Sequence, residues 1–164
     1  MKKLCIILLA ALLLAGCQSA QNSVGDTLTL YFIKIYDENA PSELVIQPIE
    51  YKTESIPSVS SLVELYLKGP EDPALYSCYP KGTQLINIED TGKQLFITLS
   101  KECASMSPLN ITLSGSCLSK TLFPYTEAEK ITIMAEGGFA NISEPPVFDR
   151  NNIAVSDINH QSAS

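Results

Sequence analysis

The side chains in this 164-residue chain most capable of chemistry are five cysteines and a single histidine. Nucleophilic sites of the Ser-His-Asp or Cys-His type need an imidazole that folded structure holds in place. His160 lies in the polar segment 151–164, which has little to bury and is expected to fray. We therefore expect a protein that is not an enzyme.

Three cysteines follow the first two at wide spacings, at Cys78, Cys103 and Cys117. This spacing does not match a zinc knuckle, so we expect no metal site from them. If 83–89 and 93–100 form a hairpin that turns near Thr91, Cys78 and Cys103 face each other at its open end. The pattern predicts a disulfide between these two residues, with Cys117 as a small core residue.

Other ligand-binding patterns are weak. The sequence contains neither of the two common glycine-rich phosphate loops. The acidic pairs Glu71-Asp72 and Glu89-Asp90 could each bind Ca²⁺, but ordinary solvated turns are the favoured explanation. No two carboxylates stand out as a glycosidase pair. We expect no cofactor.

The amino-terminal segment reads as an export signal. Lys2 and Lys3 precede an apolar run over 4–15, which as a helix spans only about 18 Å and is too short for a bilayer core. The run ends in Leu14, Ala15, Gly16 and Cys17, which resembles the lipobox of bacterial lipoproteins. We predict a signal peptide over 1–16 and lipid, with palmitate-type acyl chains, on Cys17. The alternative is an ordinary signal peptide that happens to contain a cysteine.

The predicted lipid anchor implies a place at the cell membrane, with the domain on the extracytoplasmic side. Segment 17–26 is a short polar tether that reaches about 30 Å when fully extended. With 18 acidic and 11 basic side chains, the formal net charge is −7, which argues against nucleic acid as a partner. The same charge disfavours direct binding to anionic lipid, so the acyl chains must hold the protein at the membrane.

The rest of the chain alternates strand and helix patterns. Pro48 lies inside the second predicted strand and indicates a sheet edge or a bulge. We predict strands over 27–36, 44–54, 83–89, 93–100 and 130–136, with helices over 58–68 and 107–123. The expected fold is α+β, a mixed sheet of about five strands with two helices packed on one face, in a domain spanning 27–150.

Several short motifs in this order resemble the GerMN domain of GerM-type sporulation and spore-germination proteins. They are the opening strand 30–32, Leu-Lys-Gly-Pro at 67–70, Tyr-Pro-Lys-Gly-Thr at 79–83, Thr-Leu at 121–122 and Ala-Glu-Gly at 135–137. The resemblance covers about residues 27–138. The cysteine in the loop 77–79 and the turn 124–126 depart from the family pattern.

This resemblance implies a fold similar to ring-building motifs and a non-catalytic role in the cell envelope. The expected partners are other envelope proteins, with self-association as a further possibility. Tyr31, Tyr66 and Tyr76 are candidates for the contact surface if they are exposed. Two alternatives stay open, a small solute-binding lipoprotein and a cell-wall-active lipoprotein.

Overall fold

Both helices and the five longer strands form where the apolar pattern of the sequence predicts them. The computed structural model describes residues 25–35 and 44–153. In chain order the elements are β1 (Asp26–Ile35), β2 (Leu44–Thr53), α2 (Val59–Leu67), β3 (Leu75–Tyr76), β4 (Leu85–Asp90), β5 (Gln94–Leu99), η1 (Lys101–Cys103), α3 (Pro108–Leu122), η2 (Phe123–Tyr125), β6 (Lys130–Ala135) and β7 (Val147–Asp149). Serine caps begin both helices, because the Ser58 and Ser107 side chains accept from the backbone N–H groups three residues later.

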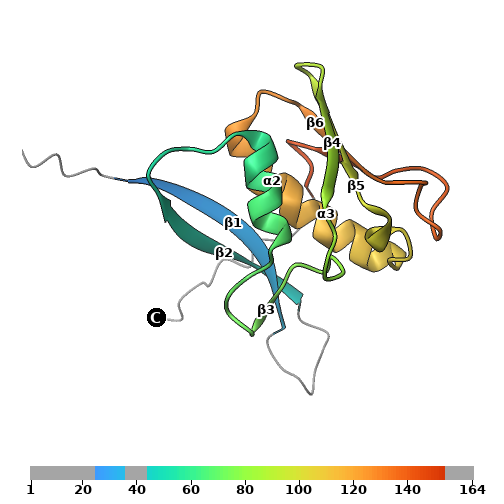
Figure 1. Ribbon diagram of the computed structural model, residues 1–164, viewed down its shortest axis with the longest axis horizontal. Coiled ribbons are helices and arrows are strands. Elements are labelled where there is room, and N and C mark those ends of the chain that lie inside the picture. The colour runs from blue at the N-terminus through green and yellow to red at the C-terminus, as the bar shows by residue number, and fades with distance from the viewer. Residues whose placement is uncertain (1–24, 36–43, 154–164) are drawn as a thin grey trace, which may run out of the picture.

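The strands belong to two sheets, with strand orders β2-β1-β3 and β4-β5-β6-β7. β5 and β6 are parallel and the other neighbours are antiparallel, so the predicted mixed α+β class is confirmed. The prediction that all strands form one sheet is wrong. β1 and β2 stand apart from the β4–β7 sheet, on the other side of α2 in the view of Figure 1. The two short strands β3 and β7 were not predicted.

Side chains from α3 and η2 occupy part of the edge of β1 that is not paired with β2. On the edge of β1 that faces away from β2, the Tyr31 N–H donates to Thr121 Oγ1 at 3.0 Å, and the Thr29 N–H donates to the Tyr125 hydroxyl at 3.3 Å. Backbone donors that side chains already satisfy are not free to join a strand ladder. β1 therefore pairs on this edge only with β3, near its C-terminal end.

Pro48 confirms the predicted edge. In an antiparallel pair, the N–H and C=O of one residue point to the same side of the strand, and the side alternates along the chain. Because the Tyr31 N–H points away from β2, its register partner Pro48 also presents its backbone away from β1. The missing N–H of the proline falls on the open edge and costs no ladder bond.

Helix α3 lies at the centre of the fold, and small residues fill much of its surface. It is buried around most of its circumference, and it contacts β1, β7 and α2. At Gly115 the ring of Phe148 approaches so closely that an added Cβ would lie 2.2 Å from its Cζ atom. The small residues of α3 thus let a helix pack tightly between the two sheets.

Arg150, the only arginine in the chain, secures the end of the described domain. Its guanidinium donates to the carbonyl oxygens of Phe123 at 2.8 Å, Ala128 at 2.8 and 3.1 Å, and Thr126. It also lies 4.9 Å from the centroid of the Phe123 ring. A single side chain therefore joins the residue after β7 to the segment that links α3 to β6.

Candidate functional site

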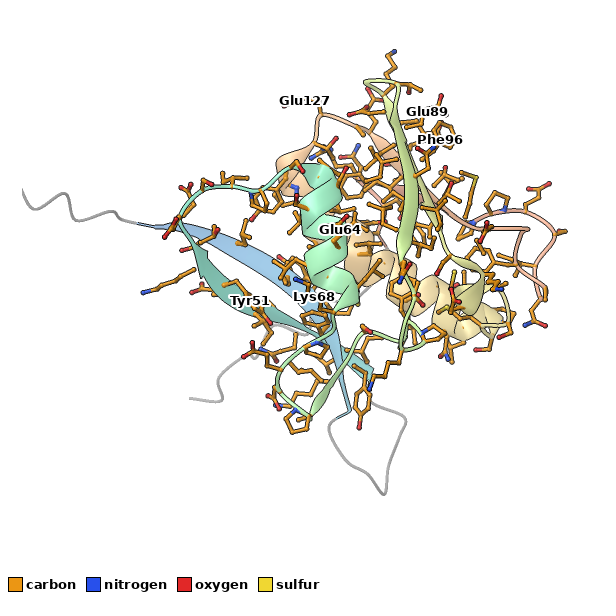
Figure 2. The ribbon with its side chains drawn as sticks, in the orientation of Figure 1. Tyr51, Glu64, Lys68, Glu89, Phe96 and Glu127 are labelled. Atoms are coloured by element: carbon orange, nitrogen blue, oxygen red, sulfur yellow. The ribbon has the colours of Figure 1, made fainter. Side chains whose placement is uncertain are left out.

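One concave surface of the described residues is a groove of about 1280 Å³. It lies between the end of α2, the first turns of α3 and the long loop that leads from α2 through β3 to β4. The residues that line it include Glu64, Lys68, Tyr76, Cys78, Tyr79 and Leu109. In Figure 2 the labelled Glu64 and Lys68 mark the α2 side of this region.

The loop along the groove is shaped by turn residues. Gly69 and Gly82 have φ values of +82° and +92°, which a residue with a Cβ rarely adopts. Asp72 Oδ1 accepts from the Ala74 N–H at 2.9 Å, and the Thr83 side chain donates to the Pro80 carbonyl at 2.8 Å. These bonds hold the loop in a defined shape, so the groove is built by the fold.

Two large apolar side chains are exposed on the groove. Tyr76 is 48% exposed and Leu109 is 61% exposed, and they come from β3 and from the first turn of α3. Of the three tyrosines proposed from the sequence as contact candidates, only Tyr76 is exposed; Tyr66 is fully buried and Tyr31 is half-buried. Exposed apolar groups that share one concave surface are typical of a binding site.

Beneath the groove lies a set of packed aromatic rings. The rings of Phe32 and Tyr66 stack with their centroids 4.9 Å apart, and Tyr79 meets Tyr66 edge-on at 6.2 Å. The hydroxyl groups of Tyr66 and Tyr79 are buried without a hydrogen bond of good geometry, although the Cys117 thiol lies beside the first and the Ser114 hydroxyl beside the second. The aromatic layer couples β1, α2 and the loop.

The predicted Cys78–Cys103 disulfide is absent, because Cys78, Cys103 and Cys117 are all free thiols. The turn of the β4–β5 hairpin lies later than predicted, since the Thr91 N–H donates to the Gln94 carbonyl across it. The register therefore differs from the one that aligned the two cysteines.

The end of the hairpin also changes direction before Cys103. β5 ends at Leu99, and Lys101–Cys103 forms a 3₁₀ turn. Within it the Cys103 thiol donates to the Ser100 carbonyl at 3.1 Å. Cys103 thus lies in a turn beyond the strand and does not extend the hairpin toward Cys78.

The thiols and phenols around the aromatic layer are held in their neutral forms. Burial raises the pKa of Cys117 to about 12, and the nearby Cys78 thiol adds to this shift. Burial likewise raises the pKa of Cys103 to about 11, raises the pKa of Cys78, and raises those of Tyr66 and Tyr79 well above the ordinary value. A thiol protonated at neutral pH is a poor nucleophile.

The remaining candidates from the sequence do not converge on the groove or on a metal site. His160 and the lipobox residues Leu14, Ala15, Gly16 and Cys17 lie outside the described residues. In each of the two acidic turns, an aspartate side chain accepts a hydrogen bond from a backbone N–H of the same turn. Asp72 does so in the first turn, and in the second Asp90 Oδ1 accepts from the Gly92 N–H at 2.7 Å. Within 25–35 and 44–153, no three metal-binding side chains gather into a possible ion site.

The groove itself was not predicted from the sequence. The available signal was the density of Pro and Gly between α2 and β4, which indicated a loop without showing that α3 lies beside it. In the part of the chain that the structure describes, no helix has the length and apolar character needed to span a bilayer.

Two solved structures from one sporulation protein share this fold. The tandem GerMN domains of GerM from Bacillus subtilis match with a TM-score of 0.59 at 12% identity, over 83% of this chain and 48% of that one. The present chain thus spans about half the length of the tandem structure. The first GerMN domain of the same protein matches with a TM-score of 0.53 at 16% identity, over 77% of this chain and 99% of that one. No curated protein sequence matches the chain.

The sequence also matches a family model directly. Residues 29–140 fit the Germane model, described as sporulation and spore germination. The match starts inside β1 and ends beyond β6, so it includes both helices and every lining residue of the groove named above. The resemblance to GerMN domains inferred from the short motifs is confirmed, and the chain belongs to the Germane family of sporulation and spore germination proteins.

Proposed function

We propose that this protein is a lipid-anchored module on the extracytoplasmic face of the cell membrane. In this proposal its Germane domain binds another envelope protein through the groove and catalyses no reaction. The observation that carries the proposal is the pair of exposed apolar side chains, Tyr76 and Leu109, on the groove of a sporulation-family domain.

The size and opening of the groove favour a polypeptide as the bound partner. Sites for small molecules typically enclose about 300–1000 Å³ and bury most of the ligand. This groove exceeds that range at about 1280 Å³, and two large side chains on it are about half exposed. Tyrosine is one of the residue types enriched among the few side chains that supply most of the binding free energy at protein interfaces.

A binding role also agrees with the protonation of the groove residues. The thiol of Cys78 and the phenol of Tyr79 are two of the potential nucleophiles on the groove, and the pKa of each is raised by burial. Both are therefore neutral at physiological pH and unsuited to nucleophilic attack.

Site-specific photo-crosslinking in sporulating cells of the source bacterium tests the groove. A photoreactive residue at Tyr76 or Leu109 is expected to give a discrete crosslink to an envelope protein. The same residue at Val147, which is 53% exposed on β7 and does not line the groove, is the matched control. An equally strong crosslink to the same protein from Val147, or none from the groove positions, would contradict the proposal.

Two further measurements separate this proposal from the alternatives. Cys17→Ala is expected to move the protein from the membrane fraction to the soluble extracytoplasmic fraction, and unchanged membrane retention would refute the lipid anchor. A clear rise in Tm with a small solute would favour a solute-binding protein. Turnover of cell-wall fragments would favour a hydrolase.

A further inference from the structure

The sheet formed by β4, β5, β6 and β7 has one face on the core and one face turned away from it. Ile133 and Phe148 point toward α3, where both lie close to Gly115. Because side chains alternate along a strand, their neighbours Thr132 and Val147 point away from the helix. We call this side of the sheet the outer face. By the register of the strands it carries Phe96, Thr98, Thr132, Met134 and Val147.

The outer face has a continuous apolar surface that crosses three strands. The register pairs Phe96 with Thr132 and Thr132 with Val147, so these side chains form one row. Val147 is 53% exposed, and neither Phe96 nor Met134 is among the described side chains that pack against the core. Apolar side chains that gather on one open surface are typical of a contact with another protein.

The centre of this face can be covered without the loss of a hydrogen bond. Thr132 lies in the middle of the row and is only 3% exposed. Its hydroxyl already accepts from the side-chain amide of Gln94 at 2.7 Å. A hydroxyl with a partner inside the molecule does not become unsatisfied when a second surface covers it.

Two opposite charges flank Phe96 on the outer face. Glu89 of β4 is the register partner of Phe96 on one side of β5, and it lies next to Phe96 in Figure 2. On the other side of β5, Lys130 of β6 lies two residues before Thr132, which is the second neighbour of Phe96. Both charged side chains are exposed. The acidic group and the basic group therefore lie one strand away from β5 in opposite directions.

This arrangement of charges is self-complementary. We consider two copies placed face to face and related by a two-fold axis that runs along β5 between them. The rotation lays β4 of each copy over β6 of the other and brings the two Phe96 rings together at the axis. Glu89 of one copy then lies over β6 of the second copy, about 7 Å along the strand from its Lys130. Side chains of this length can close that distance, and the strands of the two sheets stay nearly aligned, as in packed β-sheets.

We propose that the outer face is an interface at which two copies of this chain pair about this two-fold axis. The interface does not depend on the groove, because none of the outer-face residues lines it. In the photo-crosslinking experiment, Val147 should therefore give a product of two chain masses and not a crosslink to the envelope partner of the groove. The two proposals can fail separately.

Sedimentation equilibrium of the purified full chain tests the interface. A non-ionic detergent whose density matches that of the solvent keeps any acyl chains in micelles and adds nothing to the measured mass. The wild type is expected to shift from one chain mass to two as its concentration rises. Phe96→Ser should lower the association constant at least about tenfold. Association through acyl chains would be unaffected by this substitution.

Charge reversal tests the two-fold arrangement itself. Glu89→Lys and Lys130→Glu should each lower the association constant at least about tenfold, because each variant places two pairs of like charges in the interface. An equimolar mixture of the two variants should associate as the wild type does, since both pairs then have opposite signs again. Glu127→Lys is the matched control. Glu127 is exposed and lies apart from Glu89 and Phe96 in Figure 2, so this variant should also associate as the wild type does.

Three results would each overturn the proposal. The first is a wild-type chain that stays at one chain mass at every concentration. The second is a Phe96→Ser variant that associates as strongly as the wild type. The third is a mixture of the two charge variants that associates no more strongly than either variant alone. The charge variants change only exposed side chains, so the test still decides if Phe96→Ser does not fold.

Discussion

The Thr121 side chain accepts a 3.0 Å hydrogen bond from the backbone N–H of Tyr31 and donates one of 2.9 Å to the Cys117 carbonyl. Through this hydroxyl, α3 occupies the position beside β1 that another strand would take in a continuous sheet. The bond therefore satisfies a backbone donor of β1 on the edge where no strand pairs with it.

Thr121→Val should destabilise the domain by about 1–3 kcal/mol, because it keeps the shape of the side chain and leaves the Tyr31 N–H without an acceptor. Urea unfolding measures the loss. Thr112→Val is the matched control, since the Thr112 hydroxyl donates to a carbonyl four residues earlier, Pro108 at 3.0 Å, but is exposed on the same helix. Equal losses in the two variants would show that the contact with β1 contributes nothing.

Gly115→Ala should destabilise the domain by about 1–2 kcal/mol, although alanine is normally the better helix former by about 1 kcal/mol. The reason is the ring of Phe148, whose Cζ atom would lie 2.2 Å from the new Cβ. In the Phe148→Leu background the same substitution should be neutral or stabilising. A double-mutant cycle by urea unfolding tests this, and a coupling energy near zero would contradict the close contact.

Arg150→Ala should cost about 1–2 kcal/mol, because its guanidinium joins three carbonyl groups around η2. Arg150→Lys should recover only part of this loss, since an ammonium group cannot match the planar fork of donors. Lys93→Ala, an exposed cation in the β4–β5 turn, is the control and should change stability by less than about 0.5 kcal/mol. Full recovery in Arg150→Lys would show that charge alone matters.

Most of the fold could be predicted from the sequence, because local patterns determine most of its elements. Apolar residues alternate along β5 and β6 in the sequence, and Leu95, Ile97 and Ile133 from this pattern are buried. The caps Ser58 and Ser107 and the edge residue Pro48 could be predicted for the same reason. The signal in each case lies within a few residues of the element.

The division into two sheets and the groove could not be predicted in this way. The division depends on Thr121 meeting Tyr31, 90 residues away, and a threonine in a helix gives no sign of that contact. The groove depends on α3 lying beside a loop that ends well before it in the sequence. The hairpin alignment that suggested the Cys78–Cys103 pair was wrong, because a small error in the position of the turn changes every partner in a hairpin.

Stability should fall as the pH rises above 9. The pKa of Cys117 is about 12 in the folded protein against an ordinary 9.0, so between these values the unfolded chain loses a proton that the folded chain keeps. Since the unfolded state then binds fewer protons, the free energy of unfolding decreases, by up to about 1.4 kcal/mol per pH unit from this thiol. Its contribution is complete below pH 9.

Urea unfolding from pH 8 to pH 10.5 in the presence of a reductant measures this slope. Cys117→Ala should show a shallower decline than the wild type, because it lacks the group whose pKa differs between the two states. Parallel slopes for the two proteins would show that ionisation of Cys117 does not contribute.

Pro48→Thr should leave the free energy of unfolding within about 0.5 kcal/mol of the wild-type value and increase self-association. The substitution adds an N–H group to the open edge of β2, where another strand could pair with it. Light scattering at rising protein concentration measures the mass. A variant that stays at the wild-type mass at every concentration would show that the proline does not protect the edge.

The pairing of β1 with β2 extends over ten residues, whereas β7 is held by only three pairs with β6. A force applied to the chain ahead of Asp26 acts along β1 and shears this whole ladder, so its hydrogen bonds must break together and cannot open one at a time. A force applied after Asp149 is resisted by the three pairs of β7 and by the hydrogen bonds of Arg150. The domain should therefore withstand mechanical extension better from its amino end, the end at which an anchor on Cys17 would hold it.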